Sequence, residues 1–85
     1  MKTIVWQPRA LKQLKKLGDK AAQQRILTAT TALERFPAVG GVKALVNHAC
    51  GYRLRVGDYR ILFNVLDAIE VVSIEEVKKR DESTY

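Results

Sequence analysis

Two runs of alternating apolar and polar residues, separated only by Gly57-Asp58, constrain the fold of this chain more than any other feature. The first run is Tyr52–Val56, and the second begins at Tyr59. Alternation with a period of two indicates a β-strand with one buried face, and a two-residue Gly-Asp link is typical of a tight hairpin turn. The sequence therefore predicts an antiparallel hairpin centred on Gly57-Asp58.

The register of this hairpin predicts a cluster of arginines. Opposed positions are counted outward from the turn, so Val56 should face Tyr59 and Arg55 should face Arg60. One face of the hairpin is then apolar, and the other carries Arg53, Arg55 and Arg60. Because like charges opposite each other destabilise a sheet, this face requires a nearby anion. Two interpretations are open: the arginines are solvated on the outer face of the sheet, or they bind an anionic ligand.

A third strand is expected at Glu70–Glu75, after a turn. If Asp67-Ala68 form the loop of that turn, Glu75 falls opposite Arg60 and supplies an internal counterion. This register would favour a purely structural role for the arginines. The remaining segment, Glu76–Tyr85, is expected to be a charged tail or a short helix.

The first half of the chain has the pattern of a short strand followed by two helices. Thr3–Trp6 is the candidate strand, Pro8 suits the first turn of a helix, and Gly18 ends that helix. Asp19 is expected to cap a second helix, which Pro37 stops. The apolar residues at helical spacing are Leu11, Leu14 and Leu17 in the first helix and Ala22, Ile26, Ala29, Leu33 and Phe36 in the second. The two helices should therefore form a helical hairpin with one face to bury.

Length and cysteine content narrow the class of protein. We expect residues 1–85 to form one domain with a single modest core. Cys50 is the only cysteine, so an internal disulfide is excluded, and with only His48 beside it no metal or cofactor is expected. The sequence lacks the apolar run of a signal peptide or of a membrane span, so a soluble cytoplasmic protein is expected.

The segment between the second helix and the hairpin holds a candidate strand and a loop. Lys43–Val46 is the short candidate strand, and Asn47–Gly51 is the loop that enters the hairpin. A lone loop histidine such as His48 is more often a surface residue than a catalytic one, although its chemistry suits proton transfer. Cys50 has no evident activating partner and is expected to be a small buried residue.

The net charge of +6 indicates a polyanionic partner. Residues 1–42 carry eight basic and two acidic side chains, whereas residues 43–85 balance seven with seven. The lysines of the first helix are either a solvated surface or a set of nonspecific phosphate contacts. The arginines of the hairpin are a local cluster within a neutral half.

The order of elements, with the hairpin run Tyr52–Phe63, the segment Val77–Asp81 and the terminal Tyr85, resembles the RelE/ParE superfamily of bacterial toxins from type II toxin-antitoxin systems. The resemblance covers nearly the whole chain. It implies an α+β fold, the RelE-like microbial RNase-type fold, with two N-terminal helices packed on one face of a small antiparallel β-sheet. The opposite, concave face would bind the substrate.

The superfamily divides by activity. RelE-like members are ribosome-dependent mRNA endonucleases that cut the codon in the ribosomal A site, whereas ParE-like members poison DNA gyrase and lack the nuclease residues. The RelE-like positions fall on Arg53, Arg55, Arg60, Arg80 and Tyr85, and their joint presence implies a metal-independent endoribonuclease. The alternatives are a ParE-like gyrase poison and a toxin-fold protein that acts only as an antitoxin-binding corepressor.

The chemistry of metal-free RNA cleavage suits these residue types. The 2′-hydroxyl must be deprotonated, the negative charge of the phosphorane stabilised, and the 5′-oxygen leaving group neutralised. Arginine stays protonated, so Arg53 and Arg55, which replace lysines of some family members, have electrostatic roles. Tyr85 is either a base whose phenolate is favoured by neighbouring cations or a side chain that stacks on a nucleobase. Protonated His48 and water are both candidates for the general acid.

The resemblance also implies partners. These are the ribosome with its mRNA, and a cognate antitoxin whose acidic, partly disordered segment wraps the toxin. Operator DNA would be contacted only through the toxin-antitoxin complex, and no membrane partner is expected. The expected RNA-binding or ribosome-binding residues are Lys12, Lys15, Lys16, Lys20, Lys43, Lys78 and Lys79.

Overall fold

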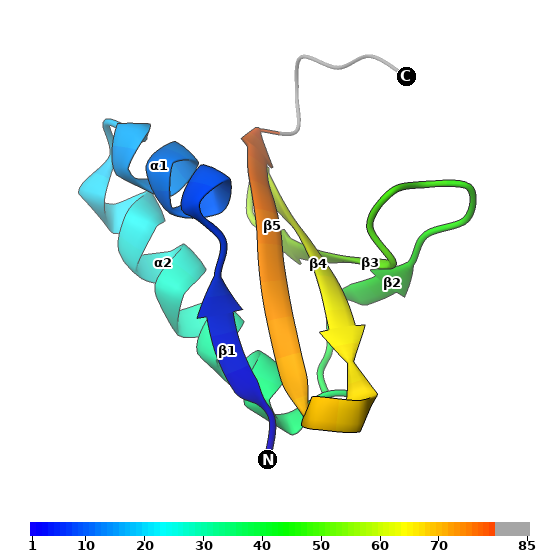
Figure 1. Ribbon diagram of the computed structural model, residues 1–85. Helices are drawn as coiled ribbons and strands as arrows, with labels where there is room; N and C mark the ends of the chain where they lie inside the picture. The colour runs from blue at the N-terminus through cyan, green and yellow to red at the C-terminus, as the bar shows by residue number, and fades with distance from the viewer. Residues whose placement is uncertain (80–85) are drawn as a thin grey trace.

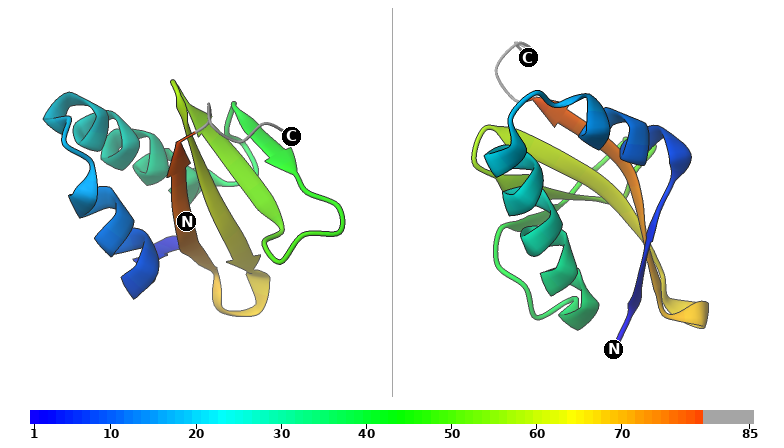
Figure 2. Two further views of the ribbon diagram at one scale, coloured as in Figure 1. Left: turned by 90° about the horizontal axis from the view of Figure 1, so that it is seen from above. Right: turned by 90° about the vertical axis from the view of Figure 1, so that its left-hand side faces the viewer.

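The structure is a computed structural model that describes residues 1–79. Two helices cover one face of a sheet, which within these residues has five strands in the order β1-β5-β4-β3-β2 (Figures 1 and 2). The predicted α+β fold, with both helices on one face of a small sheet, is confirmed. In chain order the elements are β1 (Thr3–Trp6), α1 (Pro8–Lys16), α2 (Lys20–Thr31), β2 (Val42–Ala44), β3 (Tyr52–Val56), β4 (Tyr59–Leu66) and β5 (Val71–Lys79), with 3₁₀ turns at Ala32–Arg35 and Asp67–Ile69.

One pair of strands departs from the expected antiparallel arrangement. β2 to β5 pair antiparallel with their neighbours, but β1 lies parallel to β5, with Thr3 opposite Val71 and Trp6 opposite Ile74. The chain leaves β1 through both helices and returns to the same sheet only later, as a parallel pair requires. The hydrophobic pattern of a four-residue strand does not reveal this direction.

The β3–β4 hairpin has the predicted register. Val56 pairs with Tyr59, and Arg55 pairs with Arg60. Gly57 has a φ of +57°, while Asp58 is not among the residues with positive φ. A positive φ at only the first loop position is the pattern of a type II′ turn, whose twist matches that of the flanking strands. The two-residue turn therefore sets which side chains share a face.

The helices begin and pack for identifiable reasons. The Asp19 side chain accepts hydrogen bonds from the backbone N–H groups of Ala21 at 2.9 Å and Ala22 at 3.2 Å, so it caps α2 as predicted. In α1, Ala10 and Leu14 are buried, whereas Leu11 is 38% exposed. The prediction that Leu11 lies on the buried side was wrong because it stands one residue, or about 100° of helix rotation, from Ala10.

The core lies between the helices and the inner face of the sheet. The apolar hairpin residues predicted to face inward all belong to it or pack against it. Phe36, Tyr52 and Phe63 form an aromatic cluster, with ring centroids 5.0 Å apart for Phe36 and Tyr52 and 5.5 Å apart for Tyr52 and Phe63. Such pairs stabilise the fold beyond the area that they bury. With this face filled, the alternate residues of the hairpin must lie on the outer face.

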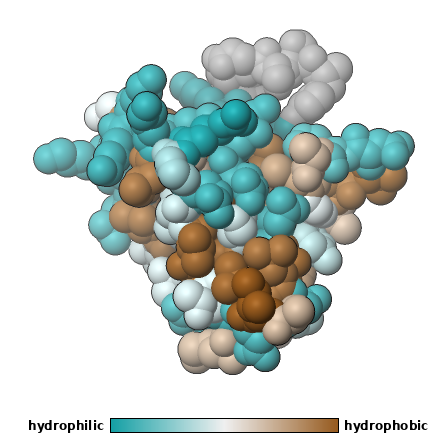
Figure 3. All heavy atoms as spheres, in the orientation of Figure 1, coloured by the Kyte–Doolittle hydropathy of each residue, from teal (hydrophilic) through white to brown (hydrophobic). Residues whose placement is uncertain are grey.

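The surface differs between the two ends of the sheet. Hydrophobic residues gather near the connection between β4 and β5, where Leu66 is 46% and Ile69 is 66% exposed (Figure 3). The opposite end, near the β3–β4 turn and Lys79, carries the basic side chains described below. Among the described residues, neither helix has the length and apolar character needed to cross a membrane.

Candidate functional site

The strands bring basic side chains together on the outer face of the sheet. Five of them, with three other residues, surround a pocket of about 460 Å³. Its lining residues come from β2, from the loop after β2, and from β3, β4 and β5. We call this feature the cationic pocket; it is lined by Lys43, Leu45, His48, Arg53, Arg60, Leu62, Lys78 and Lys79.

The sheet register explains why these cations meet. Lys43 on β2 pairs with Arg53 on β3, and Arg60 on β4 pairs with Lys78 on β5. Directly opposed residues on neighbouring strands have Cβ atoms about 5 Å apart and point to the same face. Leu62, opposite Arg53, is 5% exposed and forms an apolar floor. Clustered guanidinium and ammonium groups over such a floor suit an anion, because they can donate charge-assisted hydrogen bonds to it and because Arg53 and Arg60 are half-buried.

The pairing of β4 with β5 shows that Glu75 does not lie opposite Arg60 as expected. Lys78, not Glu75, lies opposite Arg60. The Glu75 carboxylate instead accepts a hydrogen bond of 2.7 Å from the hydroxyl of Ser73. Glu76–Lys79, expected to belong to a tail or short helix, continues β5. The structural role predicted for Glu75 beside Arg60 was therefore wrong, and the pairing adds another cation there.

Two local features cause this shift of register. The connection is not the two-residue loop Asp67-Ala68: the 3₁₀ turn Asp67–Ile69 is followed by Glu70 in the left-handed conformation, with a φ of +54°. These residues lengthen the loop by two. A register shift between Leu62 and Phe63 adds one residue on β5. Such a β-bulge redirects the side chains that follow it, and here it brings Lys78 onto the pocket face.

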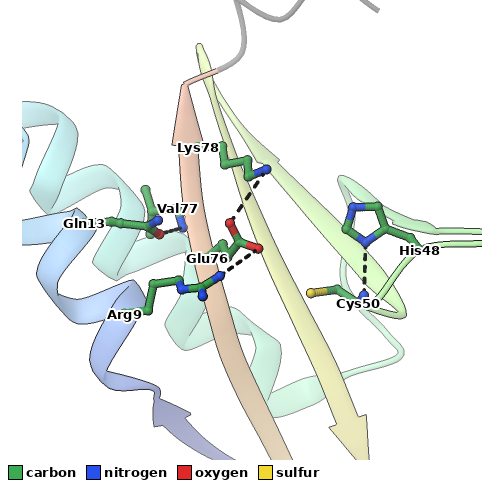
Figure 4. A network of polar contacts seen from close by, with 7 residues as sticks. All are labelled: Arg9, Gln13, His48, Cys50, Glu76, Val77 and Lys78. Carbon is green, nitrogen blue, oxygen red and sulfur yellow. Dashed lines mark hydrogen bonds and ion pairs between the residues drawn. The ribbon is translucent and has the colours of Figure 1, made fainter.

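Glu76 is an acidic residue of this face that sequence reasoning missed. Its carboxylate lies 3.6 Å from an Arg9 guanidinium nitrogen and 3.7 Å from Lys78 Nζ, and its side chain is 20% exposed (Figure 4). One carboxylate shared by two cations offsets part of the repulsion among the basic groups. Strict alternation from the core residue Ile74 would have placed Glu76 on the core face, and only the β-bulge turns it to the outer face.

His48 lines the cationic pocket, although the sequence favoured a plain surface role. Its Nδ1 accepts a hydrogen bond of 3.0 Å from the backbone N–H of Cys50 (Figure 4). Cys50 itself is buried, as expected, with 4% of its surface exposed. Burial is the main cause that raises the pKa of the Cys50 thiol, and the nearby charges of Glu75 and Glu76 raise it further.

The predicted site residues do not all line this pocket. Arg55 is exposed on the same hairpin face but is not among the lining residues. The helix lysines are exposed and are not part of the lining either: these are Lys12, Lys15, Lys16 and Lys20. Arg80 and Tyr85 lie outside the described residues. Of the residues expected to bind RNA or to act in catalysis, the pocket therefore unites Lys43, Arg53, Arg60, Lys78 and Lys79.

Acidic, histidine and cysteine side chains do not gather into a metal site in the described part of the chain: residues 1–79 contain no group of three or more that could hold a metal ion. The cations of the pocket are the groups positioned to act on an anion there.

The family of the chain follows from its sequence as a whole. A family model described as the ParE toxin of the type II toxin-antitoxin system parDE matches residues 4–84. The chain belongs to this toxin family. The protein is thus a RelE/ParE superfamily toxin of a type II toxin-antitoxin module. No curated protein sequence matches the toxin.

Solved structures agree with this assignment. A chain of the archaeal RelE-RelB complex from Pyrococcus horikoshii OT3 is 28% identical with a TM-score of 0.79; the match covers 96% of the toxin and 98% of that chain. A chain of the toxin-antitoxin complex RelBE2 from Mycobacterium tuberculosis is 26% identical with a TM-score of 0.81, and the match covers 93% and 98%. The isolated E. coli RelE toxin, at 22% identity, has the same fold with a TM-score of 0.78; that match covers 98% of the toxin and 88% of E. coli RelE.

Proposed function

We propose that this toxin is a ribosome-dependent endoribonuclease that cleaves mRNA in the ribosomal A site and so inhibits translation. The observation that carries the proposal is the cationic pocket, where Arg53, Arg60 and Lys78 converge from three adjacent strands. A gyrase poison would need a protein-binding surface, but it would not need a pocket lined by five cations. The likeness to two RelE-type chains above 25% identity supports the same activity.

In this mechanism the pocket stabilises the charge that develops on the scissile phosphate. Attack by the 2′-hydroxyl on phosphorus forms a bond to the 2′-oxygen, breaks the bond to the 5′-oxygen and passes through a phosphorane of increased negative charge. The guanidinium groups of Arg53 and Arg60 can each donate parallel hydrogen bonds to phosphate oxygens. Donors fixed in place before the reaction favour the transition state without the cost of rearrangement.

Proton transfers are assigned from the family resemblance. Tyr85 would accept the proton of the 2′-hydroxyl or would stack on a base, and Arg80 would stabilise the charge of the phosphate. The 5′-oxygen would take its proton from water or from His48. Both residues lie outside the described part of the chain. Replacement of either by Arg80→Ala or Tyr85→Phe should abolish growth arrest while the toxin still folds and binds its antitoxin.

A cognate antitoxin is the second element of the proposal. The two matched complexes hold a RelE toxin with RelB and the toxin and antitoxin of RelBE2. By analogy, a partner antitoxin binds this toxin, and an acidic segment of that antitoxin would be complementary to the cationic pocket. Contact with operator DNA would then be made through the complex.

Primer extension on a defined mRNA tests the proposal. Purified toxin should produce cuts within the A-site codon when programmed ribosomes are present and none when they are omitted. Arg53→Gln should slow single-turnover cleavage by about 10²- to 10³-fold, as loss of a transition-state donor does elsewhere. Arg25→Gln is the matched control: it removes the same charge from an exposed position of α2 that does not line the pocket.

The outcomes separate the possibilities. Equal cleavage by wild-type toxin and Arg53→Gln would contradict the role of the pocket. Absence of cuts by folded, antitoxin-free toxin would contradict the nuclease activity itself. In that case the ParE family match favours the alternative, a DNA gyrase poison, and inhibition of gyrase supercoiling by the purified toxin tests it.

A further inference from the structure

We propose that His48 acts in the cationic pocket as a neutral hydrogen-bond donor, through Nε2–H, to a phosphate oxygen of the RNA. The inference rests on the proposed nuclease function and assigns a role that neither the family motif nor the sequence pattern indicated. It also replaces the expectation that protonated His48 is a candidate general acid.

The first observation is the position of the His48 ring. His48 belongs to the loop between β2 and β3 and lines the same pocket as Arg53 and Lys78. Figure 4 shows Nε2 on the side of the ring that faces Lys78, away from Cys50. The side chain is exposed, so an incoming phosphate can reach Nε2 without rearrangement of the core.

The second observation is the hydrogen bond that the Cys50 N–H donates to His48. A backbone N–H can only donate, so the Nδ1 atom that accepts from Cys50 at 3.0 Å must hold a free lone pair. A neutral imidazole has one N–H, and with Nδ1 as acceptor that hydrogen is on Nε2. The backbone therefore selects the tautomer that presents a donor to the pocket.

The contact with Cys50 requires a ring without a hydrogen on Nδ1. Protonation of Nδ1 would place two N–H donors against each other, and it would break the hydrogen bond to Cys50. A neutral His48 transfers no proton in the reaction; it donates a hydrogen bond to a non-bridging phosphate oxygen.

Two substitutions test the roles of the two ring nitrogens of His48 separately. In His48→Asn, the amide oxygen can replace Nδ1 as acceptor for Cys50, but no donor reaches the position of Nε2. In His48→Gln, the longer amide can place an N–H donor near the position of Nε2. Single-turnover cleavage on programmed ribosomes should fall by about 10- to 100-fold in His48→Asn, which is typical for loss of a hydrogen bond to a charged group. His48→Gln should recover part of the rate.

Thermal unfolding distinguishes loss of the hydrogen-bond donor from loss of the folded state. His48→Asn should retain the Tm of the wild-type toxin because the Cys50 N–H keeps its acceptor. A His48→Asn toxin that cleaves at the wild-type rate would overturn the proposal. So would a rate loss in His48→Gln equal to that in His48→Asn, because the donor would then be irrelevant.

A spectroscopic measurement does not depend on cleavage. Long-range ¹H–¹⁵N correlation on the free toxin at neutral pH should show the Nε2–H tautomer of His48, and addition of a 2′-O-methyl RNA trinucleotide should shift its Nε2 resonance. The Nδ1–H tautomer, or an unchanged Nε2 resonance at saturating trinucleotide, would refute the inference. If the wild-type toxin cuts no mRNA but Nε2 still responds to the trinucleotide, the nuclease proposal fails and the phosphate contact of His48 stands.

Discussion

Cys50 shows how a buried residue beside the pocket differs in chemistry from the groups that line it. Its thiol is almost completely enclosed, and burial raises its pKa, with further increases from the charges of Glu75 and Glu76. Lys78 and Arg9 lower it, but by less. Because the thiolate is the reactive form, this thiol is unsuited to be a nucleophile.

We therefore predict slow alkylation of Cys50. In folded toxin at about pH 8, iodoacetamide should modify it at least about tenfold more slowly than in urea-denatured toxin, because burial limits both access and thiolate. The rate in folded toxin should keep rising at alkaline pH values where the denatured chain has levelled off. The raised pKa also contributes to the stability of the fold at neutral pH. This contribution is lost as the pH rises through the raised pKa. Equal rates in both states would contradict this assignment.

Two glycines give a matched pair of tests at the residue scale. Gly57 has a φ of +57°, and no heavy atom lies within 4 Å of the position that a Cβ would take, so the cost of a side chain there is backbone strain alone. Gly57→Ala should lower the free energy of unfolding by about 1 kcal/mol. Gly18→Ala, at an equally open position without a positive φ, should change it by less than about 0.5 kcal/mol. If urea denaturation gives the same change in the free energy of unfolding for both variants, backbone strain at the turn is excluded.

At the scale of elements, α1 holds the end of β5 that carries the pocket lysines. β1 pairs with β5 only as far as Ile74, so the outer edge of β5 beyond that residue has no strand beside it among the described residues. There the side chain of Gln13 accepts a hydrogen bond of 2.7 Å from the backbone N–H of Val77, and Arg9 reaches Glu76 (Figure 4). The helix thus replaces the missing strand as a partner of β5.

Gln13→Ala tests this anchor. It leaves the N–H of Val77, a residue with 6% of its surface exposed, without its acceptor, so we expect the free energy of unfolding to fall by about 1–2 kcal/mol. In a domain of this size, each kcal/mol lowers Tm by about 4–8 °C. Amide exchange at Val77 should also accelerate more than at Val72. Gln24→Ala, an exposed position on α2, is the control and should leave both quantities unchanged.

The elements also show how far the sequence predicts the fold. A two-residue turn leaves one register for β3 and β4, so local alternation was sufficient to place Arg53, Arg55 and Arg60 on one face. The register of β5 depends on a longer turn and on a bulge, and neither has a signal in the alternation pattern. The expected counterion Glu75 was therefore wrong, and Glu76 was missed.

At the scale of the whole molecule, the site depends on contacts between distant parts of the chain. Lys43 and His48 precede the hairpin, yet they reach its outer face because β2 folds back beside β3. Arg9 and Glu76 meet although they are 67 positions apart, because α1 packs along β5. Patterns within a window of about ten residues carry no information on such pairs. The sequence therefore predicted the arginine cluster but not the full set of residues around it.

Positive charge is spread over the toxin, and the cationic pocket holds only part of it. With a net charge of +6, the toxin should bind RNA with an affinity that falls as salt rises, because each phosphate contact releases a counterion. If overall charge alone decides binding, Arg53→Gln and Arg25→Gln should change the affinity for a 2′-O-methyl RNA oligonucleotide equally. If the pocket holds a phosphate, only Arg53→Gln should reduce the slope of log affinity against log salt, by roughly 0.7 for a single strand. Titrations at several salt concentrations decide between these outcomes. A slope lowered equally by both substitutions would mean that RNA is attracted by the molecule as a whole and that the pocket does not bind it.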